Sequence, residues 1–239
     1  MELLTFIGQA AKRKDDYTER AESLAESTGS LEKLEEEMDG RARALSRKLA
    51  FGKITFSEFQ RAVAEDTLVS SLAAVKLGYG RDSALNDSAY AETMGAMQYL
   101  WKFFEDIKRA LEEGKIEYGS AEQDFADAEE IEDDILDEIP ESALSPTPGA
   151  STPATWGGVR ARLVRYLVTP AYRWFNAGRM ARRRETGATE MRRKARSDKR
   201  TCADCREYDS AGWQPIGSLP VPGTRCRCHD RCRCVLEFR

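Results

Sequence analysis

The sequence predicts a mainly α protein, with an elongated helical body and a small C-terminal module of short strands and loops. Apolar residues recur at helical spacing through most of residues 1–139, which indicates amphipathic helices. Residues 140–155 are rich in proline, serine and threonine, as in an extended linker. Residues 201–239 hold all six cysteines and the only histidine, and their glycines and prolines exclude a long helix.

These features divide the chain into four segments. Residues 1–139 are expected to form an acidic helical domain, and residues 140–155 form the linker. Residues 156–200 form a basic helical segment that leads to a short strand, and residues 201–239 form a cysteine-rich module. A chain of 239 residues suits one or two domains.

Composition limits the classes of protein that fit. The charged fraction is 33% and the hydrophobic fraction 41%, a balance that favours elongated helices with solvated faces over a compact globule. The net charge of −4 argues against general nucleic-acid binding by the whole chain. No run is apolar enough to span a membrane, and residues 1–14 lack the basic start of a secretory signal. We therefore expect synthesis in a reducing cytoplasm, where thiols persist.

The first helices are expected to have one apolar face each. Residues 1–27 are amphipathic, residues 28–30 break the pattern, and residues 31–51 resume it. A capping box at Thr55 and Glu58 predicts the start of the next helix.

That helix should run to Leu77 and be closed by Gly78 and Gly80. Its small side chains would let another helix approach closely; they are Ser70, Ser71, Ala73 and Ala74.

A third long helix is expected from a cap within residues 86–88 to Leu111. It carries too many aromatic residues for one narrow stripe, so we expect it to be buried on more than one side; they are Tyr99, Trp101, Phe103 and Phe104. Residues 114–116 repeat the Gly-Lys-Ile of residues 52–54, which either two similar helix–turn–helix units or chance would explain.

Residues 117–141 are strongly acidic. Paired carboxylates such as Asp133 and Asp134 suit a metal or acid–base chemistry, but no glycine turn at EF-hand spacing and no phosphate loop accompany them. We interpret this stretch as a solvated helix face.

The basic segment begins with a helix over residues 156–184, which Pro170 should kink or break. Basic residues dominate 179–200, where they can meet a nucleic-acid backbone, the acidic residues 117–141 or an acidic neighbour. Short strands are expected at residues 189–195, 213–216 and 235–238.

The cysteines follow the pattern C-x2-C and then C-x-C-H-x2-C-x-C. A C-x2-C turn presents two thiolates to one tetrahedral metal, and a second pair from a distant loop can complete the site. Because so short a segment buries little apolar surface, we expect a structural zinc ion (Zn2+) to hold it together. The alternative is a set of disulfides, which needs an oxidising compartment.

The predicted zinc ligands are two pairs of cysteines: Cys202, Cys205, Cys228 and Cys232. His229, three residues before Cys232, is an alternate for Cys228, and Cys234 is a further alternate. Cys226 and Cys234 are otherwise free buried thiols or members of a different ligand set.

The module also has a wider pattern: a C-x2-C pair, a Gly-Trp-x-Pro-Ile-Gly-Ser-Leu-Pro stretch and a Cys-x3-Cys-Arg-Cys end. It comprises Cys202, Cys205, Gly212, Trp213, Pro215, Gly217, Leu219, Pro220, Cys228, Cys232, Arg233 and Cys234. This pattern resembles the C-terminal module of Mu F-like head morphogenesis (minor capsid) proteins of tailed phages. Many members end in His-Pro-x-Cys-Arg-Cys, which His229 fits, although Asp230 replaces the proline and Cys226 has no counterpart.

The resemblance implies a minor virion protein, made in the host cytoplasm and assembled at the head or the head–tail (portal or neck) region. Its partners would be portal, capsid or connector proteins, in several copies. We expect no enzyme activity and no small-molecule substrate, because the only histidine lies among the cysteines and no general base is evident. The alternative is a zinc-ribbon-like nucleic-acid-binding or adaptor protein that uses residues 179–200, whose binding would fall steeply with salt.

Overall fold

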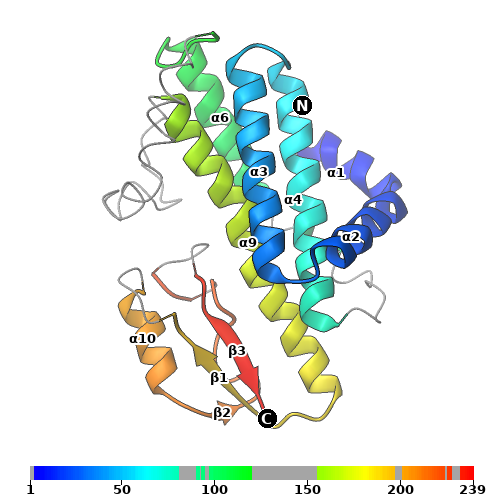
Figure 1. Ribbon diagram of the computed structural model, residues 1–239, viewed down its shortest axis with the longest axis vertical. Helices are drawn as coiled ribbons and strands as arrows, with labels where there is room; N and C mark the ends of the chain where they lie inside the picture. The colour runs from blue at the N-terminus through cyan, green and yellow to red at the C-terminus, as the bar shows by residue number, and fades with distance from the viewer. Residues whose placement is uncertain are drawn as a thin grey trace.

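The computed structural model describes residues 3–80, 90–91, 93–94, 97–119, 155–196, 201–223, 225–227 and 232–239. The fold is mainly helical and ends in a small antiparallel sheet, as the sequence predicts. In chain order its elements are α1 (Leu3–Lys12), α2 (Lys14–Thr28), α3 (Leu31–Ala50), α4 (Phe56–Tyr79), α6 (Gln98–Glu112), α9 (Trp156–Glu185), β1 (Glu190–Lys194), α10 (Ala203–Ser210), β2 (Gln214–Pro215) and β3 (Val235–Phe238). Figure 1 shows the long helices side by side, with the sheet and α10 below α3 and beside the C-terminal part of α9.

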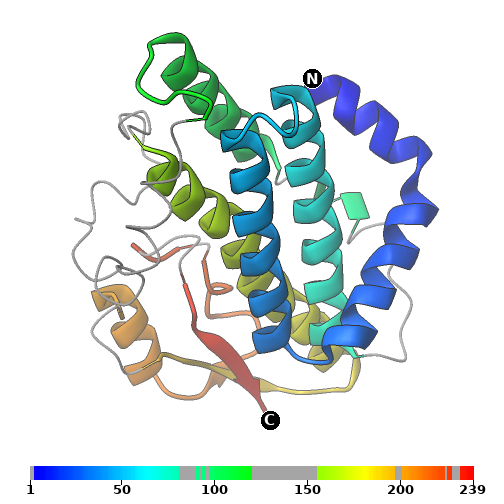
Figure 2. The same cartoon turned by 45° about the horizontal axis from the view of Figure 1, so that its top comes forward.

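Helix α4 lies at the centre of the helical body. The predicted capping box is present at its start: Thr55 Oγ1 accepts a hydrogen bond from the Glu58 amide, and the Glu58 carboxylate accepts one from the Thr55 amide. Fourteen of its residues are buried, which a helix achieves only when neighbours cover several of its faces. Side chains of α1, α2, α3, α6 and α9 enter the same hydrophobic core. Figure 2 shows these helices arranged around α4.

Helices α4 and α9 approach each other closely at a pair of glycines. A Cβ atom at Gly78 would overlap the Phe175 carbonyl, and one at Gly178 would overlap the Val75 carbonyl and lie 2.9 Å from the Tyr79 amide nitrogen. Gly78 therefore lies inside α4 and does not close it. The helix ends at Tyr79, with Gly80 at the C-cap. The close approach that the structure shows lies at these two glycines, and the predicted approach at Ser70, Ser71, Ala73 and Ala74 stays a prediction.

The expected stretch over residues 1–27 forms two helices. The backbone of Arg13 leaves helical geometry, with φ −113° and ψ 24°, and this residue separates α1 from α2. Phe51 at the end of α3 also departs from expectation. It occupies the C-cap and remains 37% exposed, because the chain leaves the apolar face of the helix there.

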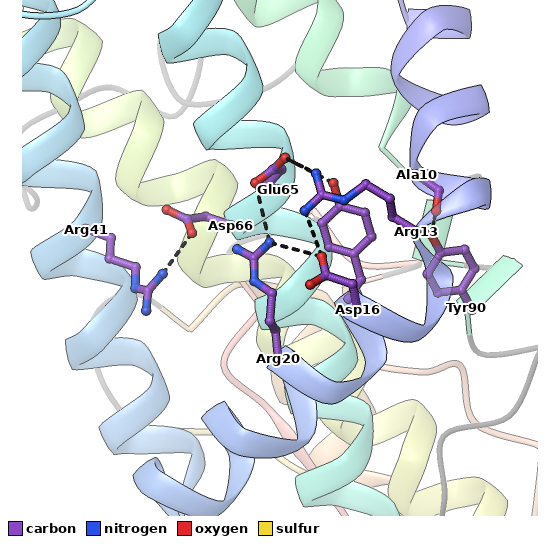
Figure 3. A network of polar contacts seen from close by, with 9 residues as sticks. Ala10, Arg13, Asp16, Arg20, Arg41, Glu65, Asp66 and Tyr90 are labelled. Carbon is purple, nitrogen blue, oxygen red and sulfur yellow. Dashed lines mark hydrogen bonds and ion pairs between the residues drawn. The ribbon is translucent and has the colours of Figure 1, made fainter.

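Two acidic residues of α4 connect it to α2 and α3 (Figure 3). Glu65 accepts hydrogen bonds from Arg13 and Arg20 at 3.4 Å, and Asp66 accepts one from Arg41 at 2.9 Å. Burial raises the pKa of Asp66, and Arg41 opposes this shift only in part. These contacts fix the two flanking helices against the central one.

The repeated Gly-Lys-Ile has a local structural meaning. Gly52 and Gly114 both adopt positive φ, 63° and 65°, and each follows a helix C-cap. In both, the glycine amide donates to a carbonyl three residues back, and the lysine amide donates to one five residues back. This is the Schellman motif, which glycine permits without a Cβ penalty. The repeat therefore marks two identical helix ends.

Helix α6 is buried on more than one side, as its aromatic residues predict. The Phe104 ring contacts Phe59 of α4 at 6.2 Å, and the Phe103 ring contacts Tyr166 of α9 at 4.8 Å. The Trp101 ring lies 5.9 Å from Phe6 of α1. Three helices thus surround α6.

Helix α9 is continuous through Pro170 over its 30 residues, so the proline does not break it. The Trp156 and Leu163 side chains are fully buried in the core that the first helices form. The hydrophobic core therefore contains side chains from both sides of the predicted linker. Of the predicted linker only Thr155 is described, as the N-cap residue of α9. The rest of it, the acidic residues 120–141 and the cap at residues 86–88 lie outside the described residues, and the predicted segment boundaries stay predictions.

The three predicted strands form one sheet in the order β2-β1-β3, with both pairings antiparallel. Asn176 of α9 connects this sheet to the helical body. Its amide donates to the Cys234 carbonyl at 3.0 Å and accepts from the Leu236 amide at 2.8 Å. Asn176 is fully buried. Its two hydrogen bonds satisfy backbone groups on the outer edge of β3, which has no neighbouring strand on that side.

Candidate metal centre

The first cysteine pair forms the start of helix α10. Cys202 is the N-cap residue, and its Sγ accepts a hydrogen bond from the Cys205 amide at 3.4 Å. A thiol at an N-cap replaces the usual hydroxyl or carboxylate acceptor. Cys205, in the first turn, is buried. The C-x2-C spacing thus places one cysteine at the helix end and the other in the interior of the module.

Three cysteines from distant parts of the module meet in its interior. The Sγ atoms of Cys205, Cys226 and Cys232 all lie within 4.8 Å of one another, and these residues are only 2–3% exposed. The Cys205 and Cys232 sulfurs are 3.7 Å apart. The edge of a tetrahedron with Zn–S bonds of about 2.3 Å is about 3.8 Å, so this pair already has the spacing of a zinc site.

Helix α10 also holds the loop that carries Cys226. The Tyr208 hydroxyl donates to the Arg225 carbonyl at 2.9 Å, and the Asp204 carboxylate accepts from the Arg227 amide at 2.7 Å. These two bonds fix the residues on either side of Cys226. The position of its thiol is therefore set by the same helix that supplies Cys205.

Cys234 is buried in the same cluster as Cys205 and Cys232. The contact with Cys205 lowers the pKa of Cys234, but the contact with Cys232 and burial outweigh it and raise the pKa to about 11. Without a metal this thiol stays protonated at neutral pH. A metal that bound it would have to displace the proton.

An arginine that the sequence did not single out completes the cluster. Arg193 of β1 is fully buried, and its Nη2 donates to the Sγ atoms of Cys232, Cys226 and Cys205 at 2.9, 3.1 and 3.3 Å. Burial acts to lower the pKa of Arg193, but the cysteines raise it above its usual value. The sequence could have indicated this arginine, because side chains alternate along a strand and Arg193 therefore lies on the same face of β1 as Met191.

The structure describes four of the six residues in the predicted ligand set and its alternates. Cys205 and Cys232 lie in the cluster, Cys202 caps the helix beside it, and Cys234 is buried beside it. Cys228 and His229 lie outside the described residues, and their assignment stays a prediction. The cluster also contains Cys226, to which the sequence assigned no definite role, because folding and not spacing brings its loop to α10.

The arrangement fits a metal ion. Three buried thiols within mutual reach form a soft donor set. Cys234 is buried beside them and Cys202 packs against them, but neither belongs to the group of sulfurs that lie within 4.8 Å of one another. Within the described residues, no helix is sufficiently long and apolar to cross a membrane. No protein-family model matches the chain, and neither the curated proteins nor the solved structures contain a match.

Proposed function

We propose that the C-terminal module is a structural zinc centre and that the chain is a minor structural or head morphogenesis protein of a tailed-phage virion. Its place would be at the head or the head–tail region, in contact with portal, capsid or connector proteins. The observation that carries the proposal is the buried cluster of Cys205, Cys226 and Cys232, which lies in the segment that resembles the Mu F-like proteins.

Zinc is the metal we propose because the described donors are thiols. Zinc accepts four thiolates in tetrahedral geometry and needs no redox chemistry to hold a fold together. A structural site is closed, with all positions filled by protein, whereas a catalytic one keeps a position for water. The buried cluster suits the closed type, so we propose a structural role and no enzyme activity.

The helical body supports a role in assembly. It presents long helices with charged outer faces around an apolar core, and the module is fixed to α9 through Asn176. A module fixed in this way keeps its orientation relative to the body. Such a rigid pair of surfaces suits a component that joins two neighbours in a particle.

The alternative, nucleic-acid binding through residues 179–200, is less well supported. Several of these basic side chains have partners within the protein: Arg192 pairs with Glu237, Lys194 with Asp209, and Arg193 with the thiols. Arg179 packs against the rings of Phe175 and Phe238. Charges used inside the module contribute less to binding of a phosphate backbone.

Native mass spectrometry of the purified chain, with and without a chelator, tests the zinc centre. We expect one zinc ion per chain; three disulfides and no metal would contradict the proposal. Mass spectrometry of purified particles from the phage that encodes the chain tests the assembly role. The polypeptide should be present in the particle, whereas its absence combined with salt-sensitive nucleic-acid binding would favour the alternative.

A further inference from the structure

Arg193 occupies a position where a small sheet normally places an apolar side chain. It lies on β1, the central strand, and faces the interior together with Met191. A guanidinium group stays charged at all ordinary pH values. A fully buried charge is very unfavourable unless the surrounding groups compensate it.

The groups around Arg193 are sulfur atoms and an aromatic ring. Its Nη2 donates to three thiols, and its Cζ lies 4.7 Å from the centre of the Tyr208 ring. Among the described residues, its Nε and Nη1 have no hydrogen-bond partner, and the groups that favour its charged form are cysteines. The negative charge that compensates this arginine must therefore come largely from the cysteines.

We propose that Arg193 is the charge-compensating and positioning residue of the metal centre, an inference that rests on the proposed zinc site. Four thiolates around Zn2+ carry a net charge of −2, and three thiolates a net charge of −1. A buried guanidinium removes one unit of this charge and donates N–H groups to the metal-bound sulfurs. Because its Nη2 contacts all three sulfurs, a metal held by them would have to bind on the side away from the guanidinium.

The same contacts allow an opposite role. Arg193 Nη2 is the only described cation in contact with all three sulfurs, so it would compete with a metal if the two excluded each other. Compensation predicts that removing Arg193 weakens metal binding. Competition predicts that removal strengthens it.

The test compares Arg193→Met with Arg192→Met in the full chain. Arg192 is its neighbour on the same strand, faces the other side, and pairs with Glu237. Zinc affinity is measured at fixed pH by competition with a chromophoric chelator. We expect Arg193→Met to lose 10- to 100-fold in zinc affinity, as for other residues that hydrogen-bond to metal ligands, and Arg192→Met to stay within about threefold of the native chain.

A spectroscopic readout separates compensation from a loss of folding. With Co2+ in the site, loss of the N–H···S bonds should move the sulfur-to-metal charge-transfer band to lower energy while the tetrahedral d–d bands persist. Arg193→Lys, which keeps the charge without the planar fork, should recover part of the affinity.

Three outcomes overturn the inference. Equal affinities for Arg193→Met and Arg192→Met would show that Arg193 does not act on the metal. Tighter binding by Arg193→Met would establish competition. A native chain that binds no zinc would remove the proposed metal centre together with this inference, whereas the first two results leave the centre intact.

Discussion

The helical body and the C-terminal module are stabilised by different chemistry. The body buries a continuous set of aliphatic and aromatic side chains from six helices. The buried cluster of the module consists of Ala195 and four cysteines, with Cys202 and Tyr208 partly buried against it. Each large apolar side chain buried in the body contributes about 1.5–3 kcal/mol. The module has few of these and depends on its thiols, Arg193 and its attachment to α9.

Removal of the proposed metal should separate the two regions most strongly. Cys205→Ser combined with Cys232→Ser, or a chelator, should unfold the module while the helices persist. Structural zinc contributes about 10–16 kcal/mol in small zinc domains. Hydrogen exchange followed by mass spectrometry should show loss of protection in β1, β3 and α10 only. Equal protection of these elements in the native and variant chains would contradict the dependence on metal.

The attachment of the module is expected to have the next largest effect. Asn176→Ala leaves the Cys234 carbonyl and the Leu236 amide of β3 without their partner, at a cost of about 1–3 kcal/mol for each. Chemical denaturation should show this loss. Thr186→Ala, at the exposed end of the same helix, is the control and should change stability by less than about 0.5 kcal/mol.

The close approach of α4 and α9 predicts a smaller loss within the body. Gly178→Ala places a methyl group against the backbone of α4, which should lower the free energy of unfolding by about 1–3 kcal/mol. Gly40→Ala in α3 is the matched control, because nothing lies within 4 Å of its added Cβ. This control should raise stability by about 0.5–1 kcal/mol. Similar values for the two variants in thermal unfolding would exclude a tight crossing.

The smallest expected effect concerns the start of α4. Thr55→Ala removes the cap and should cost about 1 kcal/mol, while Ser57→Ala, exposed in the same turn, should cost little. Hydrogen bonds from Thr55 lower the pKa of Glu58. A lowered pKa stabilises the fold above the ordinary pKa of glutamate, and this contribution is lost as pH falls through the folded-state value. The difference between native and Thr55→Ala should therefore shrink in acid, as urea titrations at pH 7 and pH 3 would show.

Local signals in the sequence predicted the elements well. The capping box at Thr55, the end of α3 before Gly52 and the three short strands all appear near their predicted positions. Each depends on contacts between residues a few positions apart, or on alternation along one strand. The sequence did not indicate the break at Arg13, where the side chain forms an ion pair with Glu65 of α4.

The sequence by itself determined that the chain is mainly helical and that short strands follow near its C-terminus, because periodicity and helix caps depend on residues a few positions apart. Only the tertiary structure decided which thiols meet. Cys226 joins Cys205 and Cys232 because Tyr208 and Asp204 hold its loop against α10. It also decided that Arg193 faces them, since the side of a strand that becomes interior depends on what packs over it.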